Sequence, residues 1–204
     1  MNTTRQLRPV AYHEAGHVVM DWALGFKAAD VTIVPEMATD TLGTARREQT
    51  PSDVLTWQAA KAAEIRFRPF QRRGMQEKDP AGYARALNEL DEAKRRHEDD
   101  KPHKRRVVLT LLGGLIAEQM GTGVRNDEGA RDDLETARVV ARGIVGSPHL
   151  IQKFLEEAER ETNKLLALHW AAVLSVAGAL EERNTLTADA VAALLGDPPP
   201  GSHS

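Results

Sequence analysis

The chain has 204 residues, 41% of them hydrophobic, which suits one domain or one domain with an appendage. Its net charge of −3 gives it no general electrostatic attraction for nucleic acids or anionic membranes. It contains no cysteine, which excludes disulfides and thiolate chemistry. The sequence has no apolar run near the roughly 20 residues of a membrane span and no apolar segment typical of a signal peptide. We therefore expect a cytoplasmic protein without a membrane span.

The most informative stretch is residues 12–19, which read Tyr-His-Glu-Ala-Gly-His-Val-Val and match the pattern H-E-x-x-H. On a helix, His13 and His17 leave the same face one turn apart, so their ring nitrogens can bind one zinc ion. Glu14 is rotated to the side, where it can take a proton from a water molecule that the metal activates. A catalytic zinc site needs one more protein ligand.

The spacing of apolar residues around this motif predicts a helix over about residues 8–24, with both histidines facing the interior. The inward stripe repeats every three or four positions and comprises Val10, His13, His17, Met20 and Leu24. An inward histidine pair needs partners, and a metal ion supplies them. The small Ala15 and Gly16 leave room for another element to pack close to this helix.

Residues 30–35 and 42–48 predict two short strands that form a small sheet beside this helix. The second strand has two alternative interpretations, which the sequence leaves about equal. It binds an extended peptide by main-chain pairing, or it is an ordinary sheet edge protected by its charged side chains.

Residues 52–104 predict a charged helical hairpin, with helices over about 53–68 and 80–100. The plain interpretation is a solvated appendage. The functional alternatives are a lid, a substrate gate or an oligomer contact.

The rest of the chain predicts a series of helices. They are expected over about residues 105–120, 130–145, 151–168 and 169–183, the last two as separate helices or as one bent helix. A short last helix that Thr187 caps follows, through Leu195. Residues 198–204 are expected to be a disordered tail.

Two carboxylates in these helices are candidates for the third zinc ligand. Glu118 shares the apolar stripe of its helix, where a carboxylate is costly unless it has a partner. Asp133 lies on the inward stripe at the start of the next helix, whereas Asp132 lies on a poorer core face and suits a helix N-cap. Periodicity favours Asp133 over Asp132 but does not rank it against Glu118.

Three segments resemble the peptidase domain of the FtsH family of ATP-dependent metalloproteases. Residues 10–17 resemble its zinc motif. Residues 113–118 are similar to its Gly-Gly-Arg-x-Ala-Glu segment, with Leu115 in place of arginine. Residues 129–134 resemble its Gly-Ala-Ser-Asn-Asp-Leu segment, with Asp132 in place of asparagine. The hairpin at residues 52–104 departs from the family, whose connection there is much shorter.

The resemblance implies a set of site residues. Asp133 is the third zinc ligand, and Glu118 is left to orient a zinc-bound histidine from outside the ligand set. The family has an equivalent Leu-Gly strand along its cleft, so Leu42, Gly43 and Thr44 are expected to bind substrate.

The expected fold is mainly α with a small β-sheet, in which a zincin-like H-E-x-x-H helix is followed by a helical bundle. We expect one peptidase domain over residues 1–204 with the hairpin inserted. The expected function is zinc-dependent endopeptidase activity on unfolded or flexible polypeptides. The sequence contains no G-x-x-x-x-G-K-[ST] loop, so either an ATPase unfoldase acts in trans or the enzyme accepts chains that are already unfolded or short. The chain could also form a homo-oligomer. The alternative function is that of a retired peptidase fold that binds proteins as an adaptor or regulator.

Overall fold

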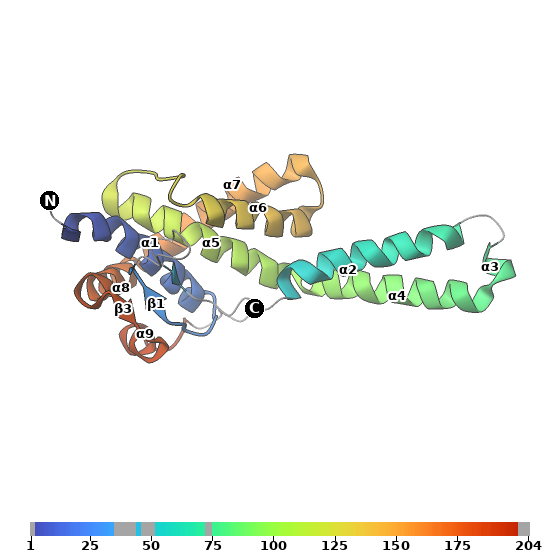
Figure 1. Ribbon diagram of the computed structural model, residues 1–204, viewed down its shortest axis with the longest axis horizontal. Coiled ribbons are helices and arrows are strands. Elements are labelled where there is room, and N and C mark those ends of the chain that lie inside the picture. The colour runs from blue at the N-terminus through green and yellow to red at the C-terminus, as the bar shows by residue number, and fades with distance from the viewer. Residues whose placement is uncertain (1–2, 35–43, 46–51, 72–74, 200–204) are drawn as a thin grey trace. The chain divides into compact units, whose positions relative to one another are not determined.

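The computed structural model describes residues 3–34, 44–45, 52–71 and 75–199 (Figure 1). It is mainly helical with a small antiparallel sheet, which confirms the predicted fold class. The chain divides into two compact units. The site unit comprises Met1–Glu48 and Arg106–Ser204, and the hairpin unit comprises Gln49–Arg105.

The site unit contains helices α1 (Thr3–Ala23), α6 (Arg131–Val145), α7 (Pro148–Leu168), α8 (Trp170–Arg183) and α9 (Ala188–Leu195), and strands β1 (Val31–Thr32), β2 (Thr44–Ala45) and β3 (Thr185–Leu186). The hairpin unit contains α2 (Ser52–Phe67), the short 3-10 helix η1 (Arg68–Gln71), α3 (Met75–Lys78) and α4 (Pro80–Asp99). Helix α5 (Lys101–Thr122) starts in the hairpin unit and lies mostly in the site unit.

Helix α1 is the central element of the site unit. Its inward side is fully buried at Ala11, Ala15 and Val19, which belong to the main hydrophobic core. It begins at Thr3, before the predicted start, and Pro9 therefore lies inside it. A proline costs a helix one backbone hydrogen bond and normally marks its first turn. This preference is why the sequence suggested a later start.

Helices α1 and α5 approach each other at two glycines. A Cβ on Gly16 would lie 2.3 Å from the carbonyl oxygen of Gly113 and 2.6 Å from the Cβ of Ala117. A Cβ on Gly113 would lie 2.8 Å from the Cγ of Met20. The backbones are therefore in direct contact at this crossing. The prediction that Ala15 and Gly16 admit a neighbouring element is confirmed.

The sheet has three strands in the order β2-β1-β3, with β1 antiparallel to both neighbours. Val31 is paired with Ala45 on one side and with Leu186 on the other. β1 is shorter than predicted, because Ile33 leaves the strand pairing and donates its N–H to the Asn184 carbonyl. β3 was not predicted. It precedes the N-cap of α9, Thr187, which accepts the Ala190 N–H.

Several helices of the bundle around α1 and α5 begin earlier than predicted. Figure 1 shows α6 and α7 on one side of α5, and α8 and α9 on the other. Helix α5 begins at Lys101 because Pro102 is tolerated in a first turn. Helix α7 begins at Pro148 for the same reason. α7 and α8 are separate helices, with His169 between them.

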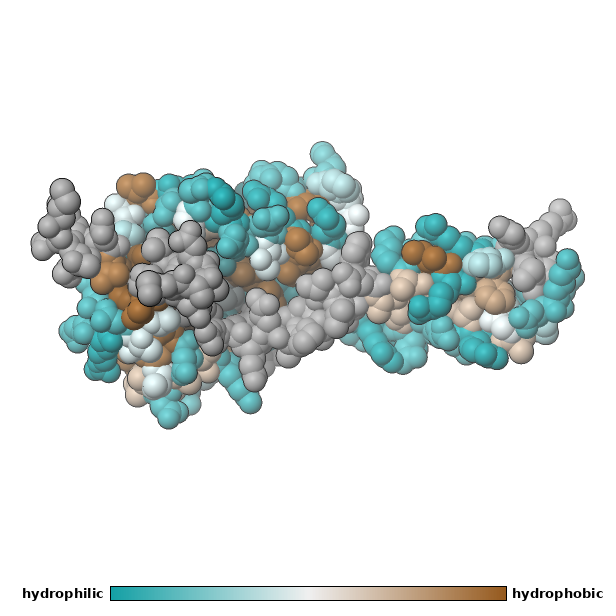
Figure 2. Space-filling view, in the orientation of Figure 1, coloured by the Kyte–Doolittle hydropathy of each residue, from teal (hydrophilic) through white to brown (hydrophobic). Residues whose placement is uncertain are grey.

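The hairpin unit has its own small core. α2 and α4 pack together through the buried Ala63, Phe67 and Leu90. The rings of Phe67 and Tyr83 lie 5.5 Å apart. Asp79 caps α4 by accepting the N–H of Gly82. The visible surface of the unit is largely hydrophilic (Figure 2). The predicted hairpin is thus present, and its role stays a prediction.

Within the described residues, no single helix is long and apolar enough to cross a membrane. α7 and α8 pass that test only as a pair, by length and composition, and the chain bends by 79° between them. The predicted disordered tail, residues 198–204, falls mostly outside the described residues.

Candidate metal centre

Two histidines lie together on the buried side of α1. His13 and His17 are one helical turn apart, and their side chains are only 12% and 10% exposed. The ring centroids are 4.8 Å apart and the ring planes differ by 76°. Their Nε2 atoms are 3.1 Å apart. Two nitrogen donors from one helix therefore approach the same point.

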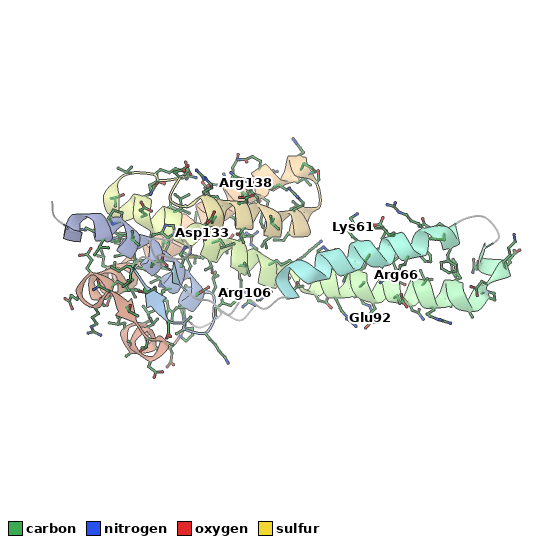
Figure 3. The ribbon with its side chains drawn as sticks, in the orientation of Figure 1. Lys61, Arg66, Glu92, Arg106, Asp133 and Arg138 are labelled. Carbon is green, nitrogen blue, oxygen red and sulfur yellow. The ribbon has the colours of Figure 1, made fainter. Side chains whose placement is uncertain are left out.

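Asp133, near the start of α6 (Figure 3), completes the group. Its Oδ2 lies 3.1 Å from the Nε2 of His13 and 3.1 Å from the Nε2 of His17. A tetrahedral zinc ion with Zn–N and Zn–O bonds of about 2.0–2.1 Å separates its ligand atoms by about 3.3 Å. The observed separations fit that requirement. His13, His17 and Asp133 therefore form a group that could hold a metal ion.

In both rings Nδ1 has a hydrogen-bond partner, which leaves Nε2 free to bind a metal. The Nδ1–H of His17 donates to the Thr110 carbonyl at 2.8 Å. The Nδ1–H of His13 donates to Oε2 of Glu118 at 3.3 Å. Because Nδ1 carries the proton in each neutral ring, the lone pair lies on Nε2. In the neutral rings that a metal requires, both Nε2 lone pairs are then available on the side where Oδ2 of Asp133 lies.

Asp21 and Thr110 extend the support of His17. Thr110 uses its carbonyl for His17 and donates its hydroxyl to Oδ1 of Asp21 at 2.9 Å. Both residues are buried. The sequence reasoning missed them. A signal was present, because Asp21 follows His17 by four positions and so lies on the same side of α1.

Gly114 makes space for the two rings. A Cβ at this position would lie 2.5 Å from Nε2 of His17 and 2.6 Å from Nε2 of His13. Any side chain there would therefore occupy the space where the donor atoms meet. The sequence showed a glycine pair at this place in α5 but not that its second member faces the histidines.

Glu14, the predicted proton acceptor, is 5% exposed and lies beside this group. Its negative charge raises the pKa of both histidines. The geometry thus combines three candidate ligand atoms with one further buried carboxylate.

The two acidic residues at the start of α6 differ as periodicity predicted. Asp133 reaches the histidines, whereas Asp132 is exposed. The suggestion that Asp132 caps α6 is wrong, because the N-cap is Ala130 and no side chain caps the helix. Glu118 is 6% exposed and contacts His13 at Nδ1, not at Nε2.

The predicted substrate-binding strand is only partly described. Leu42 and Gly43 lie outside the described residues. Thr44 belongs to β2, where it is paired with Thr32 of β1. Since β2 is an outer strand of the sheet in the described part of the chain, its role in binding a peptide stays a prediction.

The electrostatics of the metal-free site favour charged histidines. Burial lowers the pKa of His13, but hydrogen bonds with Asp133 and Glu118 outweigh it and raise the pKa to about 10. For His17, burial is likewise outweighed by the charge of Asp133, and the pKa rises. Burial raises the pKa of Asp133, but the two histidines lower it well below its usual range. At neutral pH the metal-free site therefore holds bound protons.

These shifts predict that zinc binding at pH 7 releases at least one proton per ion. A histidine with a raised pKa keeps its proton up to about pH 10, and a metal must displace it. The apparent zinc affinity should accordingly rise as pH rises from 6 to 9. Titration calorimetry in buffers of different ionisation enthalpy measures the release directly. A binding enthalpy that is the same in all buffers would contradict the prediction.

A cavity of about 400 Å³ lies elsewhere in the site unit, between α5, α6 and α7. Leu112, Leu134 and Leu155 are its apolar lining residues, and the others are polar or charged. Neither the histidines nor Asp133 line it. We therefore place the candidate chemistry at the histidine group and not in this cavity.

A scan against protein-family models finds no match to this chain, and a search of curated proteins finds none either. The FtsH resemblance therefore depends on sequence motifs, chiefly those in residues 10–17, 113–118 and 129–134. The structure adds the geometry of the donor atoms to those motifs.

Proposed function

We propose that this protein is a zinc-dependent endopeptidase that hydrolyses peptide bonds in unfolded or flexible polypeptides. The observation that carries the proposal is the convergence of His13, His17 and Asp133 at separations of 3.1 Å, with Glu14 buried beside them. The H-E-x-x-H motif and the FtsH resemblance support the same function.

The donor set favours zinc. Two imidazole nitrogens and one carboxylate oxygen are common zinc ligands, and imidazole is a poor ligand for calcium or magnesium. Catalytic zinc sites have three protein ligands and keep another position open, whereas structural sites have four. Three residues of the described chain meet here, so the set matches the catalytic kind.

A zinc ion held by His13, His17 and Asp133 would lower the pKa of a water molecule and polarise a carbonyl group. Glu14 then acts as the general base that accepts the proton from water. It returns that proton to the amine of the leaving peptide. Glu118 and Thr110 keep the two imidazole rings in the tautomer with a free Nε2.

The substrate side of the proposal depends on β2. An outer strand offers free main-chain groups to an extended peptide, and specificity then comes from neighbouring side chains. Leu42, Gly43 and Thr44 would provide that strand. By analogy with FtsH, an ATPase unfoldase acting in trans would supply folded substrates, and a homo-oligomer is a further part of the proposal.

A second candidate function is a retired peptidase fold that acts as a protein-binding adaptor or regulator. The charged hairpin unit favours it, because a second compact unit that contains none of the candidate ligands offers surface for a protein partner. The presence of Glu14 favours the enzyme, since a site without chemistry does not need a general base.

Casein hydrolysis by the zinc-loaded chain tests the proposal. Wild-type protein should cleave casein, and a chelator should stop the reaction until zinc is restored. Glu14→Gln should retain zinc but lose about 10²–10⁴-fold in rate, the usual contribution of a general base. Wild-type protein that binds zinc without cleaving casein or shorter flexible peptides would favour the adaptor. Near-normal turnover by Glu14→Gln would reject the role of Glu14.

A further inference from the structure

The loop between α5 and α6 places an asparagine against the carboxylate that holds His13. The Nδ2–H of Asn126 donates to Oε1 of Glu118 at 3.0 Å. The other oxygen of Glu118 accepts from Nδ1 of His13. Glu118 is buried and Asn126 half-buried, so both contacts are partly shielded from water. Asn126 is therefore connected to a candidate metal ligand through one carboxylate.

The same asparagine fixes the entry to the helix that carries Asp133. Its side-chain oxygen accepts the N–H of Gly129 at 3.0 Å, and its carbonyl accepts the N–H of Ala130 at 3.2 Å. Ala130 is the N-cap of α6. The amide can make its contacts with Gly129 and Glu118 in only one orientation, with nitrogen toward the carboxylate.

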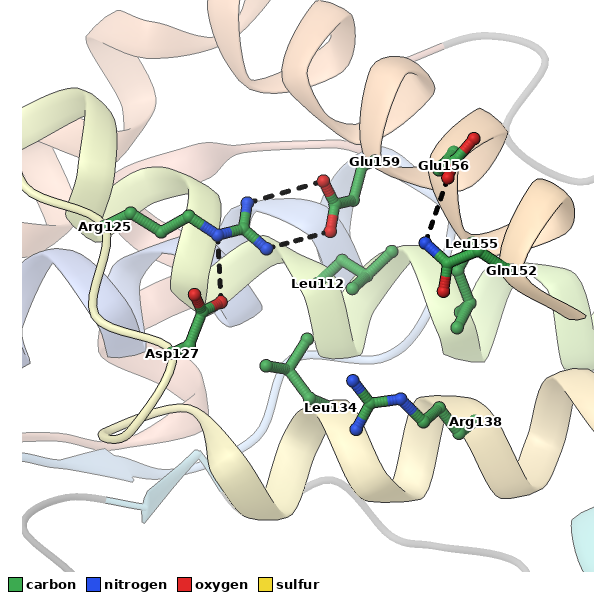
Figure 4. A pocket seen from close by; sticks show the side chains of 9 residues that line it. All are labelled: Leu112, Arg125, Asp127, Leu134, Arg138, Gln152, Leu155, Glu156 and Glu159. Carbon is green, nitrogen blue, oxygen red and sulfur yellow. Dashed lines mark hydrogen bonds and ion pairs between the residues drawn. The ribbon is translucent and has the colours of Figure 1, made fainter.

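Two further features hold Asn126 in this position. A Cβ on Gly129 would lie 2.4 Å from its Nδ2, so this glycine leaves the space that the amide occupies. The preceding Arg125 ties the loop to α7 by pairing with Glu159 at 3.0 Å, whereas its contact with Asp127 at 2.9 Å stays within the loop (Figure 4).

We propose that Asn126 is a positioning residue of the metal centre. It holds Glu118 in the orientation that keeps His13 ready for the metal, and it fixes the loop that leads to Asp133. The inference rests on the proposed zinc site. Outer hydrogen-bond partners of metal ligands typically change metal affinity about 10- to 100-fold. Since Asn126 acts through Glu118, we expect the lower end of that range.

Asn126→Asp separates the two contacts of the side chain. The new carboxylate can still accept the N–H of Gly129, but it has no donor for Glu118 and adds a like charge. We expect zinc affinity to fall about tenfold, measured on the full chain by competition with a chromophoric chelator. The thermal midpoint of the metal-free protein reports whether the fold is intact.

A reciprocal substitution provides the decisive comparison. Glu118→Gln alone should also weaken zinc binding, because its amide nitrogen faces the amide nitrogen of Asn126. In the double variant Asn126→Asp with Glu118→Gln, the glutamine nitrogen donates to the new carboxylate and its oxygen accepts from His13. Zinc affinity should return to near the wild-type value. A purely structural loop residue would give no such rescue.

Asp127→Asn is the matched control, because it weakens the loop ion pair without touching Glu118. It should leave zinc affinity unchanged. Three outcomes overturn the inference: unchanged affinity in Asn126→Asp, no recovery in the double variant, or an equal loss in Asp127→Asn. If Asn126→Asp does not fold, Gly129→Ala replaces it, because the added methyl displaces the amide. Unchanged zinc affinity in Gly129→Ala then overturns the inference.

The experiments distinguish failure of the proposed function from failure of this inference. Wild-type protein that binds no zinc would reject both. Wild-type protein that binds zinc but cleaves no substrate would reject the peptidase and leave the role of Asn126 standing.

Discussion

Gly114→Ala is expected to abolish zinc binding while the helices stay folded. The added methyl would lie within 2.6 Å of the Nε2 atoms of both His13 and His17, so the rings must move apart. Their separation of 3.1 Å is what allows one ion to bind both. The loss should exceed the roughly 100-fold upper limit for outer partners of a ligand. Metal analysis after dialysis at micromolar free zinc, with circular dichroism, measures both quantities.

Gly178→Ala supplies the control for this substitution. Gly178 also lies within a helix, α8, but a Cβ there meets nothing within 4 Å. Replacing an interior helical glycine with alanine should stabilise the fold by about 0.5–1 kcal/mol and leave zinc binding unchanged. Full zinc occupancy in folded Gly114→Ala would show that the metal, if bound, lies elsewhere.

Asp133→Ala is the second large effect that we expect. Removing the carboxylate that reaches both Nε2 atoms should lower zinc affinity by more than the roughly 100-fold typical of outer partners. Asp132→Ala removes the same charge one residue earlier, from an exposed position, and should bind zinc normally. Metal titration of the two folded variants separates the loss of a ligand from the loss of a negative charge.

Glu118→Gln tests the ranking of the two candidate third ligands. Glu118 contacts His13 at Nδ1, the nitrogen that faces away from Asp133. We therefore expect this variant to retain zinc with reduced affinity. Loss of zinc in Glu118→Gln together with retention in Asp133→Ala would place Glu118 in the ligand set.

Local sequence spacing explains the parts of the site that could be predicted. The interval between His13 and His17 dictates two rings on one helix face, one turn apart. The inward position of Glu118 followed from the apolar stripe of its helix. The inward position of Asp133 followed in the same way from the apolar stripe of the next helix. Helix existence was predictable for the same reason, whereas helix ends were not. Pro9 suggested a first turn but lies inside α1, and α5 begins at Lys101, with Pro102 in its first turn, before the predicted start.

The pairing of side chains that are distant in sequence was decided by the tertiary structure. His13 and Asp133 are separated by 120 positions, and no periodicity relates a position on α1 to one on α6. Two inward carboxylates were therefore equivalent until the packing brought Glu118 to one ring nitrogen and Asp133 to the other. β3 was missed because a two-residue strand depends on its partner.

The sequence by itself determined the histidine pair, the place of Glu14 beside it on the same helix and the inward faces of the helices, because each depends on spacing within one helical segment. Only the tertiary structure decided which carboxylate reaches the paired nitrogens, why Gly114 cannot carry a side chain, and how Asn126 connects the loop to Glu118. The constraint at Gly114 depends on the close approach of α1 and α5, the Asp133 contact on the placement of α6, and the Asn126 contact on the fold of the loop after α5. Spacing along the chain encodes none of these.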